Sequence, residues 1–204
     1  MRRGIPFLLL AGACSEGTDP GSQYYGLSQV QAEAVTDQLV IGGVGPVLAL
    51  APATVGTGLV QIPVAVSSDC PESGVIALSG SIRGTASNGA AALLLSAGES
   101  VSACGIAAQG KTYTIYAVPV LSLGGFINYL NGVMVPTQTA FINGTVQVVG
   151  DQNAQAVCPV DLTITITGWS PSVRTQGTVC GRGIDQTVVV ASDSSSQTPA
   201  RSPS

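Results

Sequence analysis

The sequence predicts a mainly β protein: an antiparallel meander of about ten strands, forming a curved sheet, half-barrel or sandwich, with one short N-terminal helix. Between residues 59 and 190, apolar and polar residues alternate with a period of two, which is typical of strands that have one dry and one wet face. Asn-Gly pairs at 88–89, 131–132 and 143–144 punctuate this region, and such pairs favour tight hairpin turns because both residues tolerate positive φ. Together these patterns indicate hairpins that follow one another along the chain.

The helix is expected to run from Ser28 to Ile41. Ser28 and Gln31 fit a capping box, in which each side chain bonds the backbone N–H of the other residue. Gly42-Gly43 is expected to end the helix, and residues 44–58 then form a linker or a segment that covers the sheet. The expected apolar face consists of Leu27, Val30, Ala34, Val35 and Ile41.

The strands follow from the alternation and from the turn residues between the apolar runs. Pro63 marks the first strand as an edge strand, because proline has no N–H to donate to a second neighbouring strand. Val60, Ile62 and Val64 share the inward face of that strand, and Ile164 lies on the inward face of a later one. The strands are expected near residues 59–66, 74–83, 91–104, 111–118, 120–128, 133–137, 139–149, 157–167, 173–180 and 184–190.

Four of the five cysteines lie within the expected sheet and are predicted to form two disulfides. Cys158 and Cys180 lie about equally far from the turn between their strands, so a hairpin brings them opposite each other. Cys70 and Cys104 likewise bracket the first Asn-Gly turn. We therefore predict the pairs Cys70–Cys104 and Cys158–Cys180. The alternative joins Cys70 to Cys180 and Cys104 to Cys158.

The register of the second hairpin contains a conflict. Matching its apolar faces pairs Val160 with Val179, and this register places Cys158 opposite Gly181, one residue beyond its predicted partner. A bulge at Cys158-Pro159 is expected to absorb the slip, since proline lacks the N–H that a regular ladder would use.

The N-terminus has the layout of a secretory signal. Residues 1–13 combine Arg2-Arg3 with a short apolar run and then small residues. The segment from Leu10 to Cys14 resembles the lipobox of bacterial lipoproteins, although Ala11 stands where that family favours leucine. The resemblance implies that Cys14 becomes the acylated first residue, which also accounts for the odd number of cysteines. It implies an exported protein anchored by lipid to the outer membrane, facing the periplasm or the cell surface. The alternative is ordinary signal-peptide cleavage at residues 11–13.

The expected organisation has five parts. Residues 1–13 are the signal peptide, 14–26 a lipid-anchored flexible tether, 27–55 the helix and an apolar linker, 56–190 the disulfide-stapled β-domain and 191–204 a disordered tail. The layout, with its lipobox, acidic tether, short helix, and the segments GKTYT, CPVDLT and GTVCG, also resembles lipoproteins of high-GC Gram-negative bacteria. That resemblance implies no particular activity.

Composition argues against several classes of function. The chain contains no histidine, so it can form neither a Ser-His-Asp triad nor a His-ligated metal site. Its formal net charge of −4 gives no footprint for nucleic acid. Asp69 and Glu72 flank Cys70 in a turn-like segment, where a solvated loop is the simplest interpretation. No catalytic residue, metal ligand or cofactor is therefore expected.

These observations favour a non-enzymatic cell-envelope lipoprotein that acts as a binding or structural β-module, with an envelope protein as its possible partner. The alternative is a periplasmic carrier of a lipid-like ligand, in which Val60, Ile62, Val64 and Ile164 line an apolar cavity beneath the helix. A hydrolase that uses Asp69, Glu72 or Asp161 is the interpretation that the composition favours least.

Overall fold

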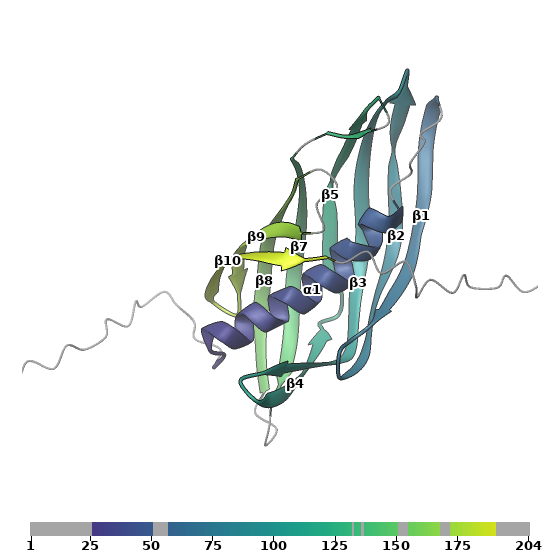
Figure 1. Cartoon of the computed structure of the whole chain (residues 1–204). Helices are drawn as coiled ribbons and strands as arrows, with labels where there is room; N and C mark the ends of the chain where they lie inside the picture. Colours follow the sequence, from purple (N-terminus) through teal and green to yellow (C-terminus); the bar gives the residue numbers. More distant parts are fainter. Residues whose placement is uncertain are drawn as a thin grey trace, which may run out of the picture.

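The computed structural model describes residues 26–50, 57–131, 133–135, 137–150, 155–167 and 172–190. These residues form one helix and ten strands (Figure 1), and each strand overlaps one of the ten expected from the sequence. The elements are α1 (Gln29–Leu50), β1 (Gly58–Asp69), β2 (Ser73–Ser87), β3 (Ala90–Ala108), β4 (Lys111–Ala117), β5 (Leu121–Leu130), β6 (Val133–Met134), β7 (Gln138–Val149), β8 (Gln155–Ile166), β9 (Ser172–Val179) and β10 (Arg182–Val189).

The strands form a single antiparallel meander, as the sequence predicts. The order across the sheet is β1-β2-β3-β4-β7-β8-β9-β10. β4 and β5 share one position between β3 and β7: β4 pairs with the end of β3, and β5 pairs with its beginning. The short β6 pairs with β5. The first strand is an edge strand, as Pro63 predicts, because β1 pairs with β2 and stands at one end of the order.

Two-residue turns with positive φ connect several of the hairpins. Asn88-Gly89 joins β2 to β3, which confirms this part of the turn prediction. Gln109-Gly110 and Cys180-Gly181 form turns of the same kind, with positive φ at both residues. Asn143-Gly144 forms no turn and lies inside β7, where a Cβ on Gly144 would come within 2.8 Å of the Leu121 side chain. Close packing against β5 explains this glycine.

The helix lies across the concave face of the sheet (Figure 1). It packs against β1, β2 and β3 near one end of the strand order and against β9 and β10 at the other end. A sheet can contact one helix with both of its ends only if it curves around that helix. The core therefore lies between α1 and the inward-facing residues of the strands. Within the described residues, no helix combines the length and the apolar character needed to cross a membrane.

The helix begins as predicted but does not end where predicted. Ser28 N–H donates to Gln31 Oε1 at 2.8 Å, and Gln31 N–H donates to Ser28 Oγ at 3.3 Å, which confirms the capping box. The expected end at Gly42-Gly43 is wrong, because α1 continues to Leu50. Residues 44–50 are therefore no linker, and as part of the helix they cover the sheet, which is the other alternative expected for residues 44–58.

The two glycines allow the helix to approach the sheet closely. A Cβ on Gly42 would lie 2.6 Å from Ile76 Cδ1, and a Cβ on Gly43 would lie 2.7 Å from Glu99 Oε2. The buried face of the helix also differs in part from the expected one. Val30 and Ile41 are 47% and 40% exposed. The residues that α1 buries include Ala32, Val35, Leu39, Val40, Val44 and Val47.

Both predicted disulfides are present. The Cα atoms are 5.4 Å apart in Cys70–Cys104 and 4.8 Å apart in Cys158–Cys180, and all four cysteines are buried. The two bonds indicate an oxidising, exported environment.

The apolar faces of the second hairpin match as expected, with Val160 opposite Val179. The expected bulge at Cys158-Pro159 is absent from the hairpin, because the pairing of β8 with β9 ends at Val160–Val179, before these residues. Instead, β9 ends and Cys180 enters the turn with a φ of 54°, where its N–H donates to Pro159 O at 2.9 Å.

Candidate functional site

The inward residues proposed as a ligand lining are part of the packed core. Val64 and Ile164 are buried, while Val60 and Ile62 are partly buried and pack against the same cluster. None of the four lines the small cavity beneath the C-terminal half of α1. That cavity has a volume of about 10 Å³, which is room for one water molecule at most. Its lining includes Val44, Val47, Leu48, Leu95, Ile127 and Ile166.

One carboxyl group interrupts this apolar interior. Glu99 on β3 points inward, where it lies beside Gly43 of α1 and opposite Leu121 of β5. Its side chain has no exposed surface, and neither carboxyl oxygen has a hydrogen-bond partner among the described residues. Burial raises the pKa of Glu99 from 4.5 to about 8. The carboxyl group is therefore largely protonated at neutral pH, since an ionised form would be an unpaired buried charge.

The convex face of the sheet, in contrast, carries a row of apolar side chains that are exposed to solvent. Leu94 of β3 stands directly opposite Phe126 of β5, and these side chains are 49% and 58% exposed. Phe141 of β7 lies diagonally next to Phe126 and is 37% exposed. Such neighbouring side chains on one face of a sheet are within contact range of each other. We call these three residues the convex apolar row.

A shallow groove includes two residues of this row, Leu94 and Phe126, in its lining. Arg83, Leu94 and Phe126 stand side by side on three adjacent strands. With Gly84, Ala92 and Asn128 they line an open depression of about 350 Å³. Within the part of the chain that the structure describes, no carboxylate lies within ion-pair distance of Arg83. The groove therefore combines an apolar wall with one uncompensated cation.

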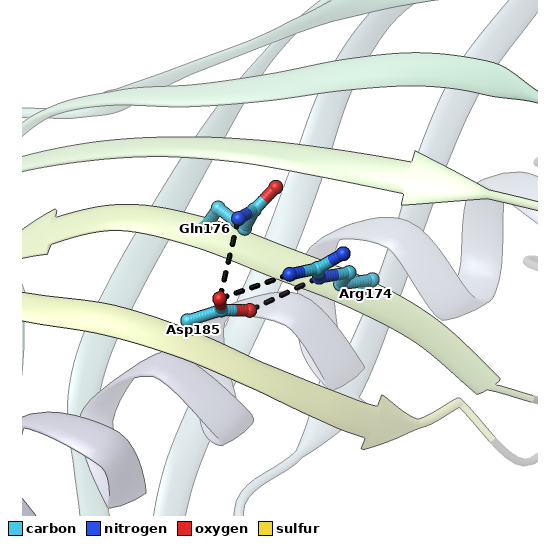
Figure 2. A network of polar contacts seen from close by, with 3 residues as sticks. All are labelled: Arg174, Gln176 and Asp185. Carbon is cyan, nitrogen blue, oxygen red and sulfur yellow. Dashed lines mark hydrogen bonds and ion pairs between the residues drawn. The ribbon is translucent and has the colours of Figure 1, made fainter.

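Among the described residues, the convex face carries a second arginine, Arg174, which is already paired with a carboxylate. Figure 2 shows Arg174 of β9 donating to both carboxylate oxygens of Asp185 on β10. The two donor–acceptor distances are 3.0 and 2.9 Å. Gln176 Nε2 donates to the same carboxylate at 3.3 Å. The hydrogen bonds from Arg174 lower the pKa of Asp185. Both side chains are more than half exposed, so this pair is a solvated surface contact.

The carboxylates weighed as catalytic candidates are not brought together. Asp69 and Glu72 are exposed at the β1–β2 connection, and Asp161 is exposed on β8. Among the described residues, no three His, Cys, Asp or Glu side chains gather as a metal site would require. Cys14 and its anchor, the tether and the tail lie outside the described residues.

Sequence reasoning missed both Glu99 as a buried group and the convex apolar row. A signal for the row was present: Leu93, Leu94 and Leu95 are consecutive, so in a strand one of them must face away from the other two. Phe126 likewise lies out of phase with the inward residues Leu123 and Ile127. No protein-family model, curated protein or solved structure matches this chain.

Proposed function

We propose that the protein is an exported cell-envelope lipoprotein, anchored through Cys14, whose β-domain binds a partner protein in the groove on the convex face. The partner is an extended segment of an envelope protein that carries apolar side chains and one carboxylate. The observation that carries this proposal is the pairing of an exposed apolar wall, Leu94 and Phe126, with the uncompensated guanidinium of Arg83. An arginine fork binds a carboxylate through two parallel hydrogen bonds.

The shape of the groove supports a macromolecular partner over a small ligand. Small-molecule sites usually enclose most of the ligand's surface, whereas this depression is open and spreads over three strands. The cavity of about 10 Å³ on the concave side is too small for a lipid-like ligand in this conformation. Exposed apolar groups beside a polar anchor are also a common composition for the centre of a protein interface.

The proposal is tested with the full chain in detergent and two fluorescent peptides. The first peptide alternates valine and threonine around one glutamate, and the second has glutamine in place of that glutamate. Fluorescence anisotropy should show that the glutamate peptide binds more tightly, and that Arg83→Gln weakens it about tenfold. Phe126→Ser should also weaken binding. Thr187→Ala, an exposed position on β10, is the matched control and should have no effect.

Three outcomes would contradict the proposal. One is equal affinity for the two peptides, and another is binding that Arg83→Gln leaves unchanged. The third is binding of decanoate, but of neither peptide, in the same assay, which would favour the carrier function instead. Loss of membrane anchoring in Cys14→Ser tests the lipoprotein part of the proposal separately, since a mature-sized variant that stays in the membrane fraction would contradict it.

A further inference from the structure

The two halves of α1 are attached to the sheet in different ways. The N-terminal half is tied by side-chain hydrogen bonds: Gln29 Nε2 donates to Gly183 O at 2.8 Å, and Gln186 Nε2 donates to Asp37 Oδ1 at 2.7 Å. Arg182 Nε donates to Leu27 O at 2.8 Å, just before the helix begins. No side-chain hydrogen bond joins residues 42–48 to any other described residue. That half is therefore held by apolar packing alone.

The C-terminal half is also intrinsically weak as a helix. It contains Gly42, Gly43 and Gly45, each of which costs about 1 kcal/mol relative to alanine in a helix interior. Pro46 follows inside the same helix, and proline removes one backbone hydrogen bond there. Poor helix propensity lowers the free energy at which a segment opens locally, relative to the rest of the protein.

Glu99 lies directly beneath this weak half. Its carboxyl group contacts the helix at Gly43 and has no hydrogen-bond partner among the described residues. We infer that Glu99 and residues 42–50 form a pH-sensitive latch, in which ionisation of Glu99 releases the C-terminal half of α1 from the concave face. Release would let water reach the carboxylate, and it would uncover the inward side chains of Leu95, Ile127 and Ile166. This inference does not depend on the proposed function.

No other charged group in the described residues faces the Glu99 carboxyl group. On α1, Glu33 and Asp37 lie in the N-terminal half, and Asp37 accepts a hydrogen bond from Gln186 of β10. Arg83 on β2 lies on the convex face, on the other side of the sheet from Glu99. On β5, Leu121 stands opposite Glu99, and Tyr129 lies eight residues further along that strand. Burial and the neighbouring Glu33 raise the pKa of Asp37 as well, so Asp37 is the control that the experiment needs.

The direction of the effect follows from the two protonation equilibria. With the helix docked, Glu99 has a pKa of about 8, whereas in contact with water it regains the ordinary value of 4.5. The released form therefore becomes more populated as the pH rises from 4.5 to 8, and its population levels off above pH 8. The opening equilibrium constant should rise about tenfold per pH unit in this window, or roughly three orders of magnitude in total.

Hydrogen exchange on the full chain at pH 5, 6, 7 and 8 tests the latch. Protection factors of amides in residues 43–50 should fall about tenfold per pH unit, and at every pH they should stay below those of residues 32–40 and of β3, which exchange through larger openings. Glu99→Gln should remove the pH dependence in residues 43–50, and Asp37→Asn should leave it in place. The binding of a hydrophobic dye should rise with pH in the wild type and stay flat in Glu99→Gln.

Two results would overturn the inference. If Glu99→Gln keeps the pH dependence of residues 43–50, another group controls the opening. If the amides of residues 43–50 and of β3 open with the same free energy at every pH, they exchange through global unfolding and no local latch exists. A third variant, Glu99→Leu, covers the case in which the glutamine variant fails to fold, because it fills the same apolar site without a titratable group.

Discussion

Each face of β3 carries one residue of the kind that belongs on the other face: a polar residue on the buried side and an apolar residue on the exposed side. On the concave face, Glu99 places a carboxyl group among apolar side chains, with no exposed surface and no hydrogen-bond partner among the described residues. On the convex face, Leu94 places an apolar side chain in water, beside Phe126 of β5. Neither feature is needed to form the sheet, since the register of β3 with its neighbours is continuous through both positions.

The comparison separates the residues that make this fold from those that give it specific properties. A buried carboxyl group costs free energy that leucine at the same position would not cost. An exposed phenylalanine gains little by folding, and it becomes useful when a partner covers it. Both exceptions therefore mark positions where a property other than stability is expected: a response to pH on the concave face and binding on the convex face.

The largest expected effect compares two adjacent residues of β5 on opposite faces. Ile127 is buried and Phe126 is 58% exposed. Ile127→Ala should lower the free energy of unfolding by about 2–5 kcal/mol, because it deletes a core side chain and leaves a cavity. Phe126→Ala should lower it by less than about 1 kcal/mol. Urea unfolding of both variants checks this, and a large loss in Phe126→Ala would mean that the convex apolar row is structural.

A smaller effect is expected from two glycines of α1. A Cβ on Gly42 would meet Ile76 at 2.6–3.0 Å, whereas a Cβ on Gly45 would have Val190 at 3.9 Å as its nearest neighbour. Gly42→Ala should therefore lower the free energy of unfolding by about 1–2 kcal/mol, because the helix must move away from the sheet. Gly45→Ala should raise it by about 0.5–1 kcal/mol through better helix propensity. Equal effects in the two variants, measured by thermal unfolding, would argue against a close approach at Gly42.

Most of the sheet could be predicted from the sequence because its signals are local. Alternation located all ten strands, and the spacing of cysteines around turns gave both disulfides. The C-terminal half of α1 could not be predicted, because Gly42-Gly43 has the same local pattern as a helix end. Only contact with Ile76 and Glu99, which lie more than 30 residues away in sequence, explains why glycine is needed there.

The candidate sites were harder to predict than the fold. Alternation places Glu99 on the same face as Leu95, Ala97 and Val101, but the sequence does not show that the helix covers this position. The convex apolar row depends on a register between β3, β5 and β7 that brings Leu94, Phe126 and Phe141 together. Alternation identifies an outward position within one strand, but it does not reveal which outward positions of other strands lie beside it.

The most direct test of this account is the stability of the wild type and of Glu99→Gln between pH 5 and 8. The pKa of Glu99 is about 8 in the folded protein, well above its ordinary value of 4.5, so the folded state retains a proton that the unfolded chain releases. Stability should thus be highest at low pH and decline as the pH rises toward 8. Urea unfolding with intact disulfides should show the wild type losing about 1.4 kcal/mol per pH unit relative to Glu99→Gln. Parallel pH profiles for the two proteins would contradict the account, because Glu99 would then be ionised or solvated in the folded state.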